Sequence, residues 1–350
     1  MTANAWELEE QTTPVIDRHR FDEAALDRYL QANLAGYRGP LTVRQFKSGQ
    51  SNPTFRLETP NARYVLRKKP PGKLLPSAHQ VDREFKAIKA LYATPVPVAK
   101  PHLLCEDAGI IGTAFYLMDC VEGRILTDLK LPGLTPKERA AHFDSMNDVL
   151  AKLHMVDYQA VGLGNFGRPD NYIARQIDRW SKQYELTRTD DIPAMEALTR
   201  WLPAHIPAEQ QTTIVHGDYR MGNVIYHPTE PRIVAVLDWE LCTLGHPLSD
   251  LGYNCLAWHI QEPPHGLGDV DLKALGLPSE QEYVAAYCRR TGRSSIQDWN
   301  FYVAFSLWRL AAIAQGVYKR GLDGIASSPE ALKRGDAARQ YSEIGWKLVG

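Results

Sequence analysis

The feature that most constrains the fold of this chain is a pair of short acidic phrases in its second half. The first reads His-Gly-Asp-Tyr-Arg-Met-Gly-Asn over residues 216–223, and the second reads Leu-Asp-Trp-Glu over residues 237–240. Apolar, β-branched runs come directly before both phrases, at 213–215 and 233–237. Because such runs are typical of buried strands, we expect two strands to bring Asp218 and Asp238 to one rim of the fold.

The spacing of three polar residues in these phrases indicates phosphoryl transfer. Asn223 lies five positions after Asp218, and Asp238 lies twenty positions after it. A phosphoryl-transfer site needs one carboxylate to orient the attacking hydroxyl and oxygen ligands to hold Mg²⁺ against the nucleotide phosphates. Taken singly, His-Gly-Asp is an ordinary tight turn and Leu-Asp-Trp an ordinary strand end. Their order and spacing together favour the catalytic interpretation.

Length, charge and cysteine usage bound the class of protein. A chain of 350 residues exceeds what one hydrophobic core normally supports, so we expect two lobes. The formal net charge of −1 gives no indication of a nucleic-acid or membrane-surface partner. Five scattered cysteines without a Cys-x-x-Cys pair favour a reducing compartment over a zinc or disulfide framework. The acidic start lacks a signal-peptide pattern and no apolar run reaches about 18 residues, so we expect a soluble, cytoplasmic protein.

The predicted elements change along the chain from short strands to long helices. A helix at 21–30 precedes five predicted strands, and one helix at 79–92 is inserted after the third strand. The strands are predicted at 41–46, 54–57, 64–67, 102–105 and 114–118. From Thr135 onward the pattern is mostly helical, with capping boxes beginning at Thr135 and Ser279 and with Gly292 as a stop signal.

This succession is the arrangement of a protein-kinase-like, two-lobed α+β fold. We predict an N-terminal lobe over residues 1–118, with a five-stranded antiparallel sheet and one helix inserted in it. A hinge at 119–124 would connect it to a mostly helical C-terminal lobe over 125–350. The chain has no His-Arg-Asp, Asp-Phe-Gly or Ala-Pro-Glu element, and only a few residues separate Asp238 from the segment at Pro247. Without room for a peptide-docking activation loop, a small-molecule acceptor is favoured over a protein.

Five phrases make the chain similar to a known family. They are the two acidic phrases, Ser-Gly-Gln-Ser-Asn (48–52), Tyr-Val-Leu-Arg-Lys-Lys-Pro-Pro-Gly (64–72) and Pro-Leu-Ser-Asp-Leu-Gly (247–252). With them the chain resembles the aminoglycoside phosphotransferase/choline kinase family of the protein-kinase-like fold, over nearly its full length from about Val43. The Arg-Lys-Lys-Pro-Pro-Gly phrase makes it most similar to the kinase domain associated with acyl-CoA dehydrogenases.

The resemblance implies an ATP site covered by the predicted sheet. Backbone groups of Gly49, Ser51 and Asn52 would close over the phosphates, although an ordinary hairpin loop also accounts for this segment. Arg67 would contact the α- and β-phosphates, because a guanidinium can hold phosphate oxygens bidentately. Its ion-pair partner would be Glu84, for which a solvated helix charge is the alternative.

The choice of phosphate-binding cation and the adenine site also follow from the resemblance. Lys68 points to the opposite face of its strand from Arg67, so only one of the two can serve, and we favour Arg67. In the hinge, Met118 would line the adenine pocket. The Asp119 carbonyl and the Val121 N–H would bond to the base.

Each polar residue of the acidic phrases has an implied role. Asp218 would be the base or orienting group for the acceptor hydroxyl, and Asn223 and Asp238 would be the Mg²⁺ ligands. Arg220 would stabilise charge on the transferring phosphoryl group, or instead face solvent or a substrate carboxylate.

Three further residues would support the site. His216 would order the catalytic loop by hydrogen bonding rather than transfer protons. Glu240 would lie just outside the metal ligands, and Asp250 would brace the loop.

The acceptor is the least defined part of the prediction. No dense acidic cluster suits a polycationic aminoglycoside, and the resemblance suggests a hydroxy acid or its hydroxyacyl-CoA thioester, with a functional link to an acyl-CoA dehydrogenase. Trp258, Trp308 and Arg309 are compatible with such an acceptor or with packed helices. The alternatives are a nucleotide-binding pseudokinase or scaffold, and an aminoglycoside- or choline-type kinase. An acyl-CoA dehydrogenase activity is disfavoured, because no length remains for a flavin domain.

Overall fold

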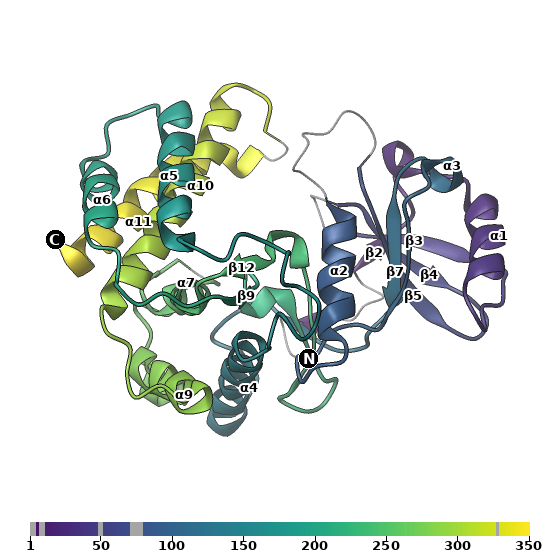
Figure 1. Ribbon diagram of the computed structural model, residues 1–350, viewed down its shortest axis with the longest axis horizontal. Coiled ribbons are helices and arrows are strands. Elements are labelled where there is room, and N and C mark those ends of the chain that lie inside the picture. Colours follow the sequence, from purple (N-terminus) through teal and green to yellow (C-terminus); the bar gives the residue numbers. More distant parts are fainter. Residues whose placement is uncertain (1–4, 7–10, 48–51, 71–79, 263, 327–328) are drawn as a thin grey trace.

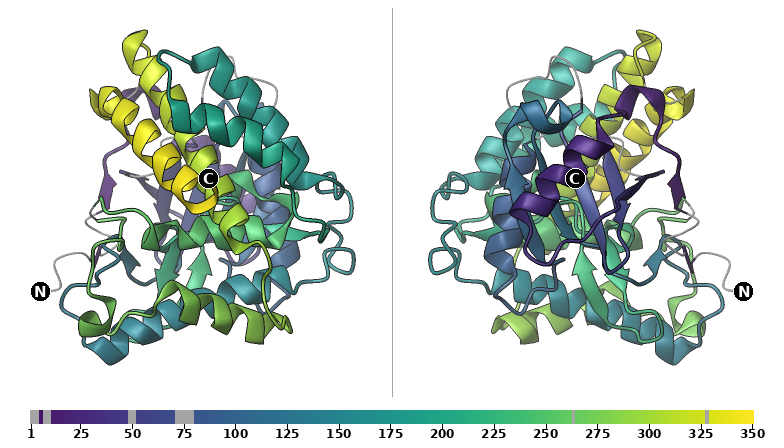
Figure 2. Two further views of the ribbon diagram at one scale, coloured as in Figure 1. Left: turned by 90° about the vertical axis from the view of Figure 1, so that its left-hand side faces the viewer. Right: turned by 90° about the vertical axis from the view of Figure 1, so that its right-hand side faces the viewer.

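The computed structural model describes residues 5–6, 11–47, 52–70, 80–262, 264–326 and 329–350. A β-sheet with two outer helices lies on one side of the molecule and a group of helices on the other, with helix α2 between them (Figure 1). In the left panel of Figure 2 the C-terminal helices (yellow) face the viewer, and in the right panel, seen from the opposite end, helix α1 (purple) faces the viewer. The α+β architecture with a helical C-terminal half was predicted correctly.

Six antiparallel strands form the large sheet, in the spatial order β2-β3-β4-β5-β7-β6. Their bounds are β2 Thr12–Thr13, β3 Thr42–Phe46, β4 Thr54–Glu58, β5 Arg63–Lys68, β6 Pro101–Cys105 and β7 Phe115–Asp119. The predicted count of five was too low by the edge strand β2, which pairs with β3. This strand is two polar residues long and has no alternating apolar pattern from which it could be predicted.

One face of the sheet packs into a hydrophobic core, and the other lines a cavity. Phe55, Leu57 and Leu66 project to one face, where they form a small core with Leu26 and Leu30 of α1 (Glu23–Asn33). The short helix α3 (Ala108–Ile111) closes the same core. The opposite face, beside α2 (Val81–Leu91), carries Arg67 together with Val65, Tyr116 and Met118, which line a cavity described below. Side chains alternate along a strand, so one face can build a core while the other builds a site.

The C-terminal half is built from eight helices of the described chain. Their bounds are α4 Pro136–His154, α5 Tyr172–Thr187, α6 Pro193–Ala204, α7 Pro247–Asn254, α8 Leu272–Leu275, α9 Glu280–Thr291, α10 Trp299–Leu322 and α11 Arg334–Val349. Both predicted capping boxes are present, at Thr135 with Glu138 and at Ser279 with Glu282. Gly292 ends α9 with a positive φ of 72°, as its stop signal predicted. Within the described residues, no helix is both long and apolar enough to cross a membrane.

Short strands deliver the acidic phrases. The predicted strands before both phrases exist, as β9 (Thr213–Val215) and β11 (Ile233–Val236). They do not pair with each other: β9 pairs with β12 (Thr243–Gly245) and β11 with β10 (Val224–Tyr226). A further ladder joins the two-residue strands β1 and β8, at 5–6 and 125–126. Each acidic phrase therefore follows its own antiparallel ladder.

The predicted hinge ends on the strand β10. Arg124 and Tyr226 exchange two backbone hydrogen bonds, each 2.8 Å long. Beside them, a Cβ atom at Gly123 would lie 2.2 Å from the Tyr226 carbonyl oxygen, so only glycine fits this approach. The division into 1–118, 119–124 and 125–350 stays a prediction, because the larger core contains Ile88 and Tyr116 together with residues of the C-terminal half.

Candidate active site

Asp218 lies on the loop after β9 with both carboxylate oxygens engaged. The Tyr253 hydroxyl donates to Oδ1 at 2.6 Å, and Nδ2 of Asn223 donates to Oδ2 at 2.7 Å. Nε of Arg220 lies 3.4 Å from both oxygens. The side chain of Asp218 is 22% exposed and that of Arg220 is 50% exposed. The orientation of this carboxylate is thus fixed by two neutral donors, with one cation at longer range.

Asn223 and Asp238 are brought together by the β10–β11 ladder. Asn223 ends the 3₁₀ turn η2 (Met221–Asn223) directly before β10, and Leu237, directly after β11, donates its N–H to the Asn223 carbonyl at 2.8 Å. Asp238 follows with a φ of 62°, a left-handed conformation that is uncommon for a residue with a side chain. Because the Asn223 amide donates from Nδ2 to Asp218, its Oδ1 is the atom that can serve a cation beside Asp238.

The loop before Asp218 is braced by Asp250 of α7. Oδ2 of Asp250 accepts from the His216 N–H at 2.5 Å, and Oδ1 accepts from the Gly217 N–H at 2.8 Å. Burial alone would raise the pKa of Asp250, but the hydrogen bond and charge of His154 outweigh it and lower the pKa. Nε2 of His216 in turn lies 2.8 Å from the Leu237 carbonyl oxygen. These contacts agree with the bracing and ordering roles predicted for Asp250 and His216.

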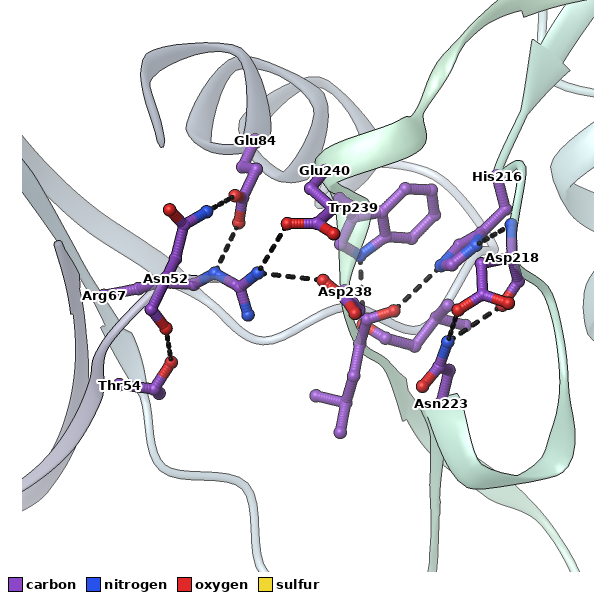
Figure 3. Close-up of polar contacts among 12 residues, drawn as sticks. Asn52, Thr54, Arg67, Glu84, His216, Asp218, Asn223, Asp238, Trp239 and Glu240 are labelled. Atoms are coloured by element: carbon purple, nitrogen blue, oxygen red, sulfur yellow. Dashed lines mark hydrogen bonds and ion pairs between the residues drawn. The ribbon is translucent and has the colours of Figure 1, made fainter. Parts of the chain in front are cut away.

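Arg67 lies at the centre of a charged network between the sheet and the loops (Figure 3). Its Nε is 2.8 Å from Oε2 of Glu84, and its Nη2 is 2.8 Å from Oδ1 of Asp238. Nη2 is also 3.6 Å from Oε2 of Glu240. Burial alone would lower the pKa of Arg67, but Glu84 and the other carboxylates raise it above its usual value. The guanidinium therefore stays charged and connects α2 to the second acidic phrase.

Glu84 is buried, with 1% of the residue exposed, so it is not a solvated helix charge. It accepts a hydrogen bond from Nδ2 of Asn52 at 2.7 Å and one from the Tyr116 hydroxyl at 3.0 Å. Burial raises the pKa of Glu84 to about 7, against the opposing influence of the Arg67 charge. The structure thus ties Asn52, predicted from the glycine loop, to the predicted Arg67–Glu84 pair; Gly49 and Ser51 lie outside the described residues.

Lys68 lies on the opposite face of β5 from Arg67. Its ammonium group is 4.9 Å from the centre of the Phe21 ring, and burial lowers its pKa. The alternation of side chains therefore separates the two cations as predicted. The one that faces the acidic phrases is Arg67.

A cavity of about 600 Å³ opens between the sheet and the acidic phrases. Its walls include the predicted adenine-pocket residues Met118, Asp119 and Val121 as well as Asn223 and Asp238. Most of the remaining wall is apolar, including Phe46, Val65, Ile88, Ala99, Ile125, Ile225 and Val236. Its size and mostly apolar wall suit a planar base, and Arg67, Asn223 and Asp238 are among its polar lining residues.

A second cavity of about 460 Å³ lies on the side of the C-terminal helices. It shares Thr127, Arg220 and Gly222 with the first cavity, so the two meet at the catalytic loop. Gly222 leaves room for the shared guanidinium, since a Cβ atom there would lie 2.8 Å from Nη1 of Arg220. Asp218 is not among the lining residues of either cavity, but Arg220, which borders both, lies 3.4 Å from its carboxylate.

Two residues beside Asp218 were not predicted to touch the site. Tyr253, which bonds to Asp218, comes three residues after Asp250 on α7, and residues so spaced share one helix face. Since Asp250 was expected to face the catalytic loop, that spacing was the signal for Tyr253. Arg309, considered only as a residue compatible with an acceptor, instead donates from Nη2 to the Gly217 carbonyl at 2.7 Å. Trp258 lines the second cavity, whereas Trp308 is buried.

The residues at the polar end of the first cavity fit a magnesium–nucleotide pair. Mg²⁺ commonly uses only one or two protein carboxylates, with phosphate and water oxygens completing its shell. The Asp238 carboxylate and the Oδ1 atom of Asn223 provide that kind of donor, and the Arg67 guanidinium suits phosphate oxygens. Among the described residues, no group of three or more His, Cys, Asp and Glu side chains could form a metal site made by the protein alone.

This arrangement of lobes, loop and cavities defines a phosphotransferase. The chain belongs to the phosphotransferase enzyme family, whose model matches residues 42–298. Its similarity extends to a crystal structure from Ralstonia eutropha, a protein provisionally named an aminoglycoside phosphotransferase. That match has a TM-score of 0.88 and 53% identity, and it covers 94% of this chain and 98% of the other.

More distant structures share the fold. The aminoglycoside phosphotransferase APH(4)-Ia, solved with ADP and hygromycin B, matches with a TM-score of 0.60 at 15% identity, covering 93% of this chain and 99% of that one. Choline kinase from Cryptosporidium parvum matches with a TM-score of 0.62 at 13% identity, covering 94% and 98%. At such identities the likeness establishes the two-lobed kinase-like fold, as predicted.

Curated relatives carry acyl-CoA dehydrogenase names. Mouse acyl-CoA dehydrogenase family member 10 is 47% identical over 342 residues, which is 97% of this chain and 32% of that protein. Human family member 11 is 43% identical over 348 residues, which is 97% of this chain and 44% of that protein. The chain thus spans less than half the length of these relatives, and the family predicted from its phrases is confirmed.

Proposed function

We propose that this protein is an ATP- and Mg²⁺-dependent kinase that phosphorylates a hydroxyl group of a small molecule. The observation that carries the proposal is the meeting of two cavities at Arg220, beside the Asp218 carboxylate and close to the Asn223 and Asp238 oxygens. One cavity has the size and wall of a nucleotide site, and the other is open to an acceptor. Membership of the phosphotransferase family supports the reaction class.

In the proposed reaction, Asp218 accepts a hydrogen bond from the acceptor hydroxyl and aligns its oxygen for in-line attack. The acceptor O–P bond forms while the bond between the γ-phosphorus and the β–γ bridging oxygen breaks, and ADP leaves. The hydroxyl proton passes to Asp218. Arg67 holds the α- and β-phosphates, and Arg220, which borders both cavities, offsets charge on the transferring group. Asn223 and Asp238 would hold Mg²⁺, which would supply neutralisation of the phosphate charge.

For the acceptor, we favour a hydroxy acid or its acyl-CoA thioester. The acceptor cavity has apolar walls and several basic side chains, with one carboxylate, Glu262, among its lining residues. The walls include Leu129, Phe143, Leu256, Trp258, Ile260 and Leu310, and the cationic residues are Arg220 and Arg334. Burial and these two arginines lower the pKa of His265, which also lines the cavity. An anionic acceptor with an apolar chain matches this lining better than a polycationic aminoglycoside does.

The names of the relatives suggest a functional link. Proteins named as acyl-CoA dehydrogenase family members match this chain over 32% and 44% of their own length. We propose that the kinase acts in the cytoplasm on a molecule that such a dehydrogenase also handles. The phosphotransferase match occupies residues 42–298, which leaves dehydrogenase chemistry to another polypeptide segment.

The test is a screen for ATP consumption with hydroxyacyl-CoAs, free hydroxy acids, choline, sugars and aminoglycosides. We expect phosphorylated product, identified by mass spectrometry, from a hydroxyacyl-CoA or hydroxy acid. Binding of MgADP without transfer to any acceptor would overturn the proposal in favour of a nucleotide-binding scaffold. Product from aminoglycosides alone would retain the kinase and overturn the acceptor class.

A further inference from the structure

Tyr253 stands between Asp218 and the acceptor cavity. Its hydroxyl donates to Oδ1 of Asp218 at 2.6 Å, and its side chain borders the cavity. It comes from the same helix, α7, whose Asp250 holds the backbone of His216 and Gly217. One face of α7 therefore reaches the catalytic loop twice, through the backbone at Asp250 and through the side chain at Tyr253.

Arg309 of α10 fixes the Tyr253 ring and the loop together. It is a buried residue, 7% exposed, whose Nη2 donates to the Gly217 carbonyl at 2.7 Å. Its guanidinium carbon lies 5.3 Å from the centre of the Tyr253 ring, within the range of a cation–π contact. Gly217 has a positive φ of 86°, so the carbonyl that Arg309 holds belongs to a turn that glycine makes possible. The guanidinium thus limits movement of both the ring and the turn that precedes Asp218.

We propose that Tyr253, held by Arg309, is a positioning residue that sets the orientation of the Asp218 carboxylate toward the acceptor hydroxyl. This inference rests on the proposed kinase function. Asn223 donates to Oδ2 of Asp218 and Tyr253 donates to Oδ1, so rotation of the carboxylate group would break both hydrogen bonds. A reacting oxygen misplaced by a fraction of an ångström loses much of the advantage of alignment.

The hydroxyl of Tyr253 stays protonated and can therefore always donate its hydrogen bond. Burial, followed by the charge and hydrogen bond of Asp218, raises the pKa of Tyr253 above its usual value. The residue therefore donates to the carboxylate at any pH where a kinase works. Its ring is also part of the acceptor wall, so the bond lies where the acceptor hydroxyl would have to approach.

The test is a double-mutant cycle between Tyr253→Phe and Asp218→Asn. Transfer from radiolabelled ATP is measured to β-hydroxyhexanoyl-CoA, and to water in parallel. In the wild-type background we expect Tyr253→Phe to lower kcat about tenfold, with an unchanged KM for ATP. In the Asp218→Asn background it should cause no further loss, because the group that it orients is gone. An equal loss in both backgrounds, or no loss in either, would overturn the inference.

Two further measurements separate this inference from the proposed function. Tyr226→Phe is the matched control: its buried hydroxyl donates to the His142 carbonyl at 3.1 Å, away from Asp218, and kcat should not change. A crystal structure of Tyr253→Phe should show the Asp218 carboxylate turned from its wild-type orientation, and an unchanged orientation would refute the role. If the wild type transfers phosphate to no acceptor, the proposed function fails, while the crystal structure still decides the positioning.

Discussion

The two sides of the cleft hold their carboxylates in different ways. Around Arg67, Glu84 of α2 and Asp238 of the second acidic phrase both contact one guanidinium, so these carboxylates share a cation. On the loop side, Asp218 is held by the hydroxyl of Tyr253 and the amide of Asn223, which are neutral donors. In the first arrangement the carboxylates share one cation, whereas in the second the neutral donors fix the direction of the carboxylate and the Arg220 guanidinium lies farther off, at 3.4 Å.

This difference assigns the two sides different kinetic parameters. Carboxylates that share one cation can exchange partners with phosphate and metal, so substitutions there should act on nucleotide and metal affinity. A carboxylate held in one direction by two donors presents a fixed acceptor oxygen to a substrate hydroxyl, so substitutions there should act on turnover. The predictions below test this separation, beginning with the largest expected effect.

Asp218→Asn should lower kcat about a thousandfold and leave the affinity for MgADP unchanged. An amide offers one acceptor oxygen to two donors, Tyr253 and Asn223, so it loses both the base and its alignment. Steady-state kinetics and calorimetric titration of MgADP measure the two quantities. A variant that turns over at the wild-type rate would remove Asp218 from the mechanism.

Asp238→Asn should lower the affinity for MgADP by about ten- to a hundredfold, because a neutral amide is a weaker ligand for Mg²⁺ than a carboxylate. Chelation of the metal with EDTA is the matched control. Without metal, wild type and variant should bind ADP equally within about twofold. A difference that persists in EDTA would show that Asp238 acts through Arg67 rather than through the metal.

Arg67→Met should raise the dissociation constant for ATP about tenfold, since phosphate loses a bidentate cation. Lys68→Met provides the comparison on the other face of the same strand, where its ammonium group lies over Phe21. We expect Lys68→Met to change nucleotide affinity by less than about twofold. The reverse result would place the phosphate cation at Lys68. Thermal unfolding should accompany both titrations, because Arg67→Met leaves Glu84 buried without its cation.

The smallest expected effect is a pH dependence of stability from Glu84. Its pKa of about 7 in the folded chain is above the ordinary 4.5, so between these values the folded state binds more protons than the unfolded state. Its contribution to the unfolding free energy therefore falls as pH rises from 4.5 through 7. Urea unfolding should show wild type losing about 1–3 kcal/mol relative to Glu84→Gln across that window. Parallel pH curves would contradict the shift.

Local patterns predicted much of this molecule. Asp218, Asn223 and Asp238 lie within short phrases whose spacing is set by strands and turns. Their proximity in the fold could therefore be predicted from the sequence. The capping boxes of α4 and α9 are equally local. Their presence at the expected positions reflects interactions that span three residues.

Contacts across long separations were the ones that escaped prediction. Arg309 meets Gly217 only because α10 packs against α7, and no spacing within either segment encodes that meeting. The edge strand β2 depends likewise on a partner, β3, rather than on its own two threonines. Tyr253 was predictable only in part. Its spacing from Asp250 places it on the helix face toward the catalytic loop, but the sequence does not show that its hydroxyl bonds to Asp218.

The attachment of Gly123 and Arg124 to the strand that follows Asn223 limits how the molecule can open. In the predicted division of the chain, a swing of the sheet over the helices would be taken up before Gly123, by the peptide units of residues 119–122. Three of those residues, Asp119, Cys120 and Val121, also border the larger cavity. The same backbone segment would then serve as the hinge and as part of the wall of the proposed nucleotide site. A bound nucleotide would therefore restrict the hinge motion that closes the sheet over it.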